Sequence, residues 1–174
     1  MKVSEYIAGF LASQGVTHIF GVAGGGNSFM ADAIAYHPKL KFIAMHHEQA
    51  AGFAAEGYAR ATGRLGVCLV TSGPGGTNAL TALAACWLDH VPVLFLSGQS
   101  FTNQMIGNTG CRQIGVQEID ILNGARAWAK EATLLGPNGI RVRLGLLCAY
   151  ASHKRPGPVW IDVPADVQNA DLPA

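Results

Sequence analysis

Short apolar segments begin at residues 42, 67 and 93 of this chain, at intervals of 25 and 26 residues. The first two are followed by stretches rich in alanine and glycine that are long enough to form a helix. Intervals of this length are typical of strand–helix–strand units. Because a helical crossover joins parallel strands with a right-handed connection, the spacing predicts an α/β fold with a central, mostly parallel sheet.

The same alternation continues along the rest of the chain. Strands are expected at 18–22, 42–45, 67–70, 93–96 and 159–163, and helices from Ser4, over 28–34, 48–62, 77–88 and 140–151, the last after a turn at 137–139. Residues 99–117 show no periodicity. A loop of that length inside a compact domain usually has a function or lies at an interface.

The charge content excludes some classes of protein. Only 13% of the residues are charged, against about 25% in an average soluble domain, and the formal net charge is +1. The chain therefore lacks the basic balance of a nucleic-acid binder. So few charges predict that another chain or domain covers part of the surface.

The sequence also predicts where the protein resides. No apolar run reaches the length of about 18 residues that a spanning helix needs, and Ser4 and Glu5 interrupt what would be the apolar region of a secretory signal. We therefore expect a cytoplasmic protein that does not bind membranes. The four cysteines have no CxxC spacing, which favours buried free thiols and predicts no metal site.

Two glycine-rich turns, at 24–26 and 73–76, follow predicted strands and precede predicted helices. Amides at a helix N-terminus suit an anion. A dinucleotide fold would have GxGxxG here, but Asn78 occupies the sixth position of the second turn, and neither turn has the P-loop pattern. Phosphate binding and tight turns with close backbone contacts both remain open.

Glu48 lies between a predicted strand and a predicted helix. The carboxyl ends of parallel strands are where α/β sheets bind their ligands, which favours a functional carboxylate. The alternative is a first-turn carboxylate stabilised by the helix dipole. The adjacent His46 and His47 make a poor metal site, because neighbouring residues at a strand end point in different directions. On the long loop, Gln117 carries an amide suited to contact a substrate, whereas Glu118 and Asp120 can begin a helix.

Residues 47–98 closely resemble the pyrimidine-binding (Pyr) domain of thiamine-diphosphate enzymes, and acetolactate synthase most of all. Their sequence is HEQAAGFAAEGYARATGRLGVCLVTSGPGGTNALTALAACWLDHVPVLFLSG. Further support comes from IFG at 19–21 with the glycine loop after it, QEID at 117–120, RPGPV at 155–159 and DVP at 162–164. The resemblance spans about residues 2–168. It implies a three-layer α/β/α domain over residues 1–168, with 169–174 as a linker or tail.

The resemblance assigns roles to particular residues. Glu48 matches the family's catalytic glutamate, whose carboxyl hydrogen-bonds N1′ of the cofactor's pyrimidine and favours its imino form. Such a carboxyl must exchange a proton near neutral pH, and burial raises the pKa of carboxyl groups towards that range. Gln117 matches a glutamine on the substrate side of the cofactor. The implied cofactor-binding residues are Gly24, Gly25, Glu48, Ser72, Gly73, Pro74, Gly75 and Asn78.

In this family a second domain binds the diphosphate and Mg²⁺, and its Gly-Asp-Gly motif is absent from these 174 residues. The resemblance therefore implies a partner domain or subunit that supplies the diphosphate and Mg²⁺ site. It also implies an isolated chain that is inactive, and a homo-oligomer. FAD occurs in relatives but is not predicted here.

The implied activity is that of a thiamine-diphosphate enzyme on 2-oxo acids, with decarboxylation and carboligation as in acetolactate synthase. Residues 110–115 depart from the acetolactate synthase pattern. Because of this departure, the resemblance implies the cofactor chemistry but does not identify the substrate. One alternative is the α subunit of a split 2-oxo-acid decarboxylase of the sulfopyruvate type. Others are a non-catalytic interaction module with the Pyr fold, and a nucleotide-binding Rossmann domain, which the broken glycine motifs disfavour.

Overall fold

Six parallel strands form one sheet in the computed structural model, which describes residues 1–136 and 138–173. The strands are β1 (His18–Gly21), β2 (Lys41–Ala44), β3 (Gly66–Val70), β4 (Val93–Gln99), β5 (Ala132–Leu134) and β6 (Val159–Pro164). They lie in the order β2-β1-β3-β4-β6-β5, and all five pairings are parallel. The predicted parallel α/β fold is confirmed.

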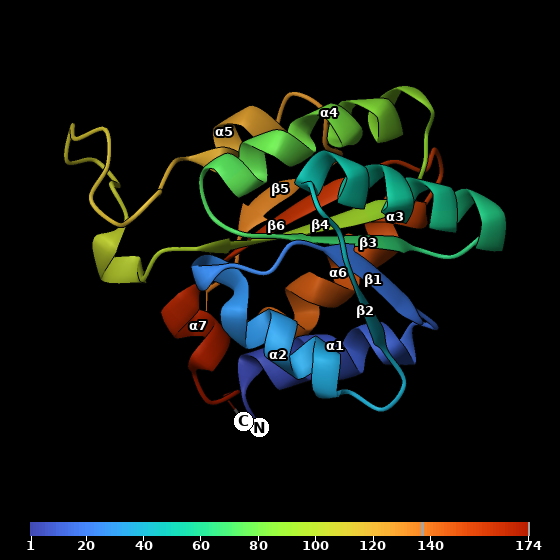
Figure 1. Cartoon of the computed structure of the whole chain (residues 1–174), viewed down its shortest axis with the longest axis horizontal. Coiled ribbons are helices and arrows are strands. Elements are labelled where there is room, and N and C mark those ends of the chain that lie inside the picture. Colours follow the sequence, from blue (N-terminus) through green and yellow to red (C-terminus); the bar gives the residue numbers. More distant parts are fainter. Residues whose placement is uncertain (137, 174) are drawn as a thin grey trace.

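Helices cover both faces of the sheet, as Figure 1 shows, so the predicted three layers are also confirmed. One layer contains α1 (Val3–Ser13), α2 (Ser28–Tyr36), α6 (Ile140–Ser152) and α7 (Ala165–Asn169). The other contains α3 (Glu48–Thr62), α4 (Pro74–Leu88) and α5 (Ile121–Ala125). Each layer encloses its own apolar core against one face of the sheet.

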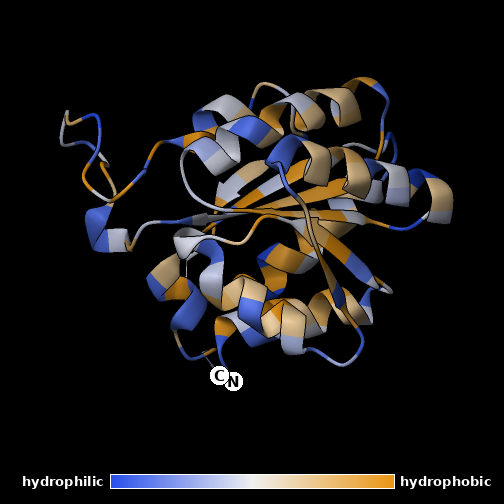
Figure 2. Cartoon of the chain, in the orientation of Figure 1, coloured by the Kyte–Doolittle hydropathy of each residue, from blue (hydrophilic) through white to orange (hydrophobic). Residues whose placement is uncertain are grey.

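Strands β3, β4 and β6 are buried on both faces, which explains why their sequences are mainly apolar. Every residue of β3, β4 and β6 is buried. Figure 2 shows the strands as a mainly hydrophobic band between the two helical layers. Between α3 and α4, Gly52 lies against Ala82 so closely that a Cβ atom would clash there. The small residues of these helices thus allow close packing.

Several boundaries differ from the predictions. Helix α4 begins at Pro74 rather than at residue 77, because proline fits the first turn of a helix. Strand β4 continues through Ser97 to Gln99, where polar residues follow the apolar run. The short edge strand β5 was not predicted. The predicted turn at 137–139 includes Pro137, which lies outside the described residues.

Residues 100–120 form a largely exposed loop that leaves the body of the domain in Figure 1 and contains the short 3-10 helix η2 (Thr102–Gln104). Thr102 anchors its beginning, since its backbone N–H and its hydroxyl donate hydrogen bonds of 3.1 and 2.5 Å to the carboxylate of Asp166. Cys111 is exposed on this loop, so the prediction of four buried thiols is wrong for it. Cys68, Cys86 and Cys148 are buried and free.

The two ends of the described chain meet beside α1 (Figure 1). Lys2 forms a 3.0 Å ion pair with Asp171, and the N–H of Leu172 donates a 2.9 Å hydrogen bond to the Met1 carbonyl. The domain boundary at residue 168 stays a prediction, and Ala174 lies outside the described residues. No helix in the described part of the chain is both long enough and apolar enough to cross a membrane.

Candidate functional site

The residues singled out in the sequence gather at the carboxyl edge of the sheet. The loop 22–27 follows β1, Glu48 follows β2, and the turn 71–75 follows β3. Because these strands are parallel and adjacent, their carboxyl ends lie at the same edge. This edge is where open α/β sheets bind ligands.

Glu48 is the first residue of α3 and is half-buried. The Asn78 amide donates a 2.9 Å hydrogen bond from Nδ2 to Glu48 Oε2. His47 caps the helix by accepting a 3.1 Å hydrogen bond at Nδ1 from the N–H of Gln49. A carboxylate is favoured at a helix N-terminus, where backbone N–H groups point outward. The structure thus fixes the orientation of the carboxylate through both the helix and Asn78.

The turn between β3 and α4 passes directly beside this carboxylate. A Cβ atom on Gly75 would lie 3.4 Å from Glu48 Oε1 and 2.7 Å from the Thr71 methyl group. Gly73 has a φ of 57° and a ψ of −119°, a conformation that side chains disfavour. Ser72 is buried and Pro74 is exposed at the first position of α4. The predicted residues of this turn therefore share one site with Glu48.

Gln117 reaches the same turn from the long loop. A Cβ atom on Gly73 would collide with the Gln117 carbonyl, so the two backbones pack directly together. Gln117 has a φ of 56°, in the left-handed region that few non-glycine residues adopt. Its side chain is exposed, and no hydrogen bond within the described residues joins it to Glu48. The structure brings Gln117 to the turn by its backbone and leaves its amide open to solvent.

The glycine loop after β1 is attached to the turn after β3. Gly26 donates a 3.1 Å hydrogen bond from its N–H to Thr71 Oγ1, and a Cβ atom on Gly24 would lie 2.7 Å from the same oxygen. Asn27, at the end of the 3-10 helix η1 (Gly25–Asn27), accepts a 2.8 Å hydrogen bond from the N–H of Gly24. Gly25 is exposed, with no neighbouring atoms around its missing side chain. The loop is therefore held at both ends and open in the middle.

A buried polar network that the sequence analysis missed lies at the ends of β4 and β6. The Ser97 hydroxyl donates a 2.5 Å hydrogen bond to Asp162 Oδ1, and Gln99 Nε2 donates 3.0 Å bonds to Asp162 Oδ2 and to the Ile119 carbonyl. Asp162 is 1% exposed, and this burial raises the pKa of its carboxyl to about 7. The bond to Ile119 fixes the loop two residues after Gln117. The signal in the sequence was the polar residues at the ends of two apolar strands.

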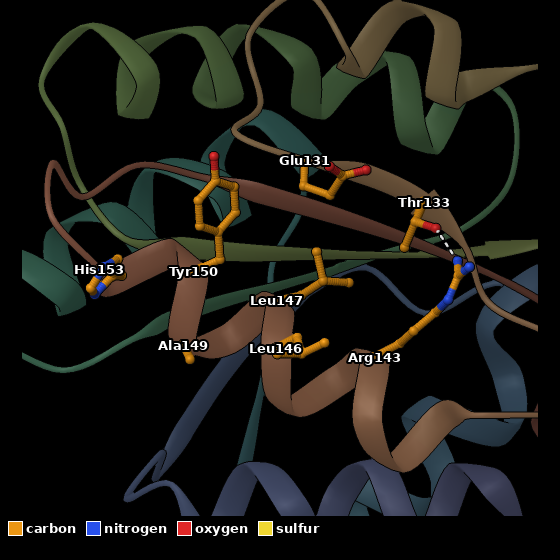
Figure 3. Close-up of a pocket in the computed structure, with 8 residues that line it drawn as sticks. All are labelled: Glu131, Thr133, Arg143, Leu146, Leu147, Ala149, Tyr150 and His153. Atoms are coloured by element: carbon orange, nitrogen blue, oxygen red, sulfur yellow. Dashed lines mark hydrogen bonds between the residues drawn. The ribbon is translucent and has the colours of Figure 1, made fainter.

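A hollow with a volume of about 570 Å³ lies elsewhere, between β5 and α6. Figure 3 shows Leu146, Leu147 and Tyr150 on α6 on one side of it, and Arg143 donating a hydrogen bond to Thr133 of β5. None of the predicted site residues lines this hollow. Among the described residues, no group of three or more His, Cys, Asp or Glu side chains is placed to hold a metal ion.

The sequence of this chain matches known proteins. A sequence model of the family described as "Thiamine pyrophosphate enzyme, N-terminal TPP binding domain" matches residues 1–123. The acetolactate synthase of Arthrospira platensis is 41% identical over 167 residues, which cover 93% of this chain and 28% of that protein.

Two further relatives cover almost the whole chain. A probable acetolactate synthase large subunit of Methanocaldococcus jannaschii is 41% identical over 173 residues, covering 99% of this chain and 28% of the relative. The acetolactate synthase isozyme 2 large subunit of Escherichia coli K12 is 37% identical over 175 residues, covering 98% and 30%. The chain thus spans less than a third of the length of these relatives.

Proposed function

Because this chain belongs to the family of thiamine pyrophosphate enzymes, matching their N-terminal TPP binding domain, we propose that it holds the aminopyrimidine of thiamine diphosphate at the carboxyl edge of its sheet. The observation that carries the proposal is the Glu48 carboxylate, held by Asn78 at the start of α3 and flanked by the turn at Gly73–Gly75. A carboxylate in this setting is suited to hydrogen-bond a ring nitrogen.

The residues present fit the group. Glu48 Oε2 accepts the bond from Asn78, whereas Oε1 accepts none from the described residues and stays available for a ring N–H. Gly75 leaves the side of Oε1 uncovered, because any side chain there would contact the carboxylate. Gly25 adds open space on the neighbouring loop. A flat heteroaromatic ring needs such close access to backbone and carboxylate.

When bound, thiamine diphosphate supplies the carbon nucleophile that adds to the carbonyl of a 2-oxo acid. In this proposal Glu48 holds or releases the proton at N1′ of the aminopyrimidine, which controls the tautomer of that ring. Asn78 keeps the carboxyl aimed at N1′. The backbone of Gly24 and Gly25, together with the turn at 72–75, borders the ring. Gln117 presents its amide to the substrate.

We propose that a second domain or subunit completes the site. The chain covers only 28–30% of the three relatives described above, and it contains no Gly-Asp-Gly sequence. The partner would bind the diphosphate and Mg²⁺, and the assembled enzyme, meaning this chain with that partner, would be a homo-oligomer. The isolated chain is then inactive and has no saturable affinity for thiamine diphosphate below millimolar concentration.

For the reaction we propose decarboxylation of a 2-oxo acid followed by carboligation, because the relatives at 37–41% identity are named acetolactate synthases. The assay supplies pyruvate, thiamine diphosphate and Mg²⁺ to the assembled enzyme and measures both acetolactate and the free aldehyde. Acetolactate as the main product supports carboligation. Aldehyde alone would instead favour the split decarboxylase.

The role of Glu48 is tested by Glu48→Gln in the assembled enzyme. Since general acid–base groups contribute about 10²–10⁴-fold to rates, we expect kcat to fall by at least about 100-fold. Glu56→Gln is the matched control, because Glu56 lies two turns further along α3 and pairs with Arg60 instead. It should keep kcat within about threefold. Unchanged turnover in Glu48→Gln would refute the catalytic assignment.

A further inference from the structure

Gln168 is a fully buried glutamine on the short helix α7, and its amide reaches back to the other end of the sequence. Nε2 donates a 2.6 Å hydrogen bond to the carbonyl of Gly26 and a 2.7 Å bond to the carbonyl of Val163. The side chain has no solvent exposure. Gly26 lies 142 positions away in the sequence. The contact therefore joins α7 to the glycine loop after β1.

The other end of the same amide has no partner. Oε1 of Gln168 is buried and accepts no hydrogen bond from the described residues. Buried polar atoms are almost always paired, so an unpaired one calls for an explanation. Here both donor hydrogens are directed at carbonyl oxygens, and in this orientation the amide oxygen faces no hydrogen-bond donor. The two carbonyl contacts are thus kept although the oxygen remains unsatisfied.

Both backbone polar groups of Gly26 are hydrogen-bonded to side chains. Its N–H donates to Thr71 Oγ1 at 3.1 Å, and its carbonyl accepts from Gln168. The end of β4 lies directly beneath, since a Cβ atom on Gly98 would collide with the Gly26 carbonyl. Of the two glycines that precede Gly26, Gly24 packs against Thr71 and Gly25 is open. The position of Gly25 depends on how Gly26 is held.

Helix α7 is itself firmly seated. Val167 is buried in the core on the α1 side of the sheet, and the N–H of Val3 donates a 3.0 Å hydrogen bond to the Ala170 carbonyl just after the helix. Asp166 binds Thr102 at the start of the long loop. Gln168 therefore projects from a rigid support towards the loop.

We propose that Gln168 is a positioning residue for cofactor binding: through the Gly26 carbonyl it sets the position of the Gly24–Gly25 backbone against the aminopyrimidine. This inference rests on the proposed function. It predicts that losing the two donor hydrogens displaces the loop and weakens the binding of thiamine diphosphate, without any change in residues that touch the cofactor.

The test uses two variants of nearly equal size in the assembled enzyme. Gln168→Met removes both donors, and Gln168→Glu replaces them with a group that donates only while protonated. We expect Gln168→Met to raise the dissociation constant of thiamine diphosphate about tenfold at every pH. For Gln168→Glu, the constant should lie between the wild-type and Gln168→Met values at pH 5.5, because a protonated carboxyl donates one hydrogen bond, and should rise as the pH increases to 8, because a carboxylate would face two carbonyl oxygens.

Two controls separate positioning from stability and from charge. Val167→Ala weakens the packing of α7 and should lower the melting temperature, yet leave the dissociation constant within twofold of wild type. Asn169→Asp adds the same charge at an exposed site on α7 and should show the wild-type pH dependence. The carboxyl groups on α7 and on the elements packed against it are those of Glu5, Asp32, Asp162 and Asp166. All four are present in every variant, so their titration is common to the whole series.

A second readout needs no cofactor. Amide hydrogen exchange of a peptide covering residues 22–29 should be faster in Gln168→Met than in wild type and in Val167→Ala. If both Gln168 variants keep wild-type exchange and a wild-type dissociation constant from pH 5.5 to 8, the positioning role is wrong. If wild type itself does not bind thiamine diphosphate, both the proposed function and this inference fail. If Glu48→Gln is fully active but the Gln168 variants behave as expected, only the role of Glu48 fails.

Discussion

Asn78 and Glu48, thirty residues apart, join the beginnings of α4 and α3 through a 2.9 Å hydrogen bond from Nδ2 to Oε2. The two helices follow β3 and β2, the strands on either side of β1. Their close packing at Gly52 and Ala82 fixes the distance between the helix axes. The orientation of the carboxylate is therefore a property of the helix pair rather than of one flexible loop.

Replacing Asn78 by leucine keeps the branched shape of the side chain but removes the donor. Hydrogen bonds to charged groups contribute about 1.5–3 kcal/mol, so we expect kcat of the assembled enzyme to fall about 10–100-fold. The control is Asn123→Leu, the same change at an exposed position of α5. Steady-state kinetics with both variants provides the measurement. Wild-type kcat in Asn78→Leu would show that Glu48 needs no such support.

The buried carboxyl of Asp162 makes stability depend on pH. Burial raises its pKa in the folded chain to about 7 from the ordinary 3.8. Between pH 4 and 7 the folded chain thus keeps a proton that the unfolded chain releases, and stability falls as the pH rises through this window. Other groups near Asp162 have smaller effects on its pKa. The hydroxyl of Ser97 and the amide of Gln99 favour the charged form of Asp162, whereas the charges of Glu118 and Asp120 oppose it.

This dependence is measured by chemical denaturation of wild type and Asp162→Asn at pH 5 and pH 8. One pKa unit corresponds to about 1.36 kcal/mol. From pH 5 to pH 8, the unfolding free energy of wild type should therefore fall relative to that of Asp162→Asn by on the order of 2–3 kcal/mol. Asp32→Asn, at an exposed carboxylate on α2, is the control and should keep the wild-type slope. Equal slopes for wild type and Asp162→Asn would contradict the prediction.

Two glycines of α3 should respond oppositely to alanine. At Gly52 the added methyl group would overlap the Ala82 methyl and lie 3.2 Å from the Phe95 ring, so we expect a loss of about 1–3 kcal/mol. At the exposed Gly57 no atom lies within 4 Å, and the better helix propensity of alanine should stabilise the chain by about 0.5–1 kcal/mol. Urea denaturation of both variants checks the pair. Equal stabilities would mean that α3 and α4 are not in close contact at Gly52.

The thiols should react unequally. Burial raises the pKa of Cys148 to about 12 and raises the pKa values of Cys68 and Cys86 as well, whereas Cys111 is exposed on the long loop. We expect one thiol per folded chain to react rapidly with a disulfide reagent that releases a coloured thiolate, and four after denaturation. Cys111→Ser should abolish the rapid phase. A rapid phase that survives this substitution would show that another thiol is accessible.

Local sequence patterns predicted the elements that are buried on both faces. The apolar runs in β3, β4 and β6 suit strands that a parallel sheet buries on both faces. Glu48 could be placed at the edge for the same reason, since it follows one strand and starts a helix. Strand β5 could not, because its three residues carry too little pattern to be distinguished from a loop.

The contacts that complete the site depend on tertiary structure. Ser97 meets Asp162 only because β4 and β6 pair in one particular register. Gln168 meets Gly26 only once α7 has packed beside α2. No spacing in the sequence encodes either pair. The prediction of a buried thiol was wrong for Cys111 because the lack of a CxxC spacing does not show whether a cysteine is buried, and the loop that carries Cys111 is exposed.

The meeting of Lys2 with Asp171, and of Met1 with Leu172, means that the chain almost closes on itself. A domain built this way tolerates circular permutation, because a short linker can join the ends and new ends can be opened elsewhere. Opening the exposed loop between residues 105 and 113 would preserve all five strand pairings. The permuted chain would begin and end in the loop that carries Gln117, so that a second domain could be fused on that side rather than beside α1.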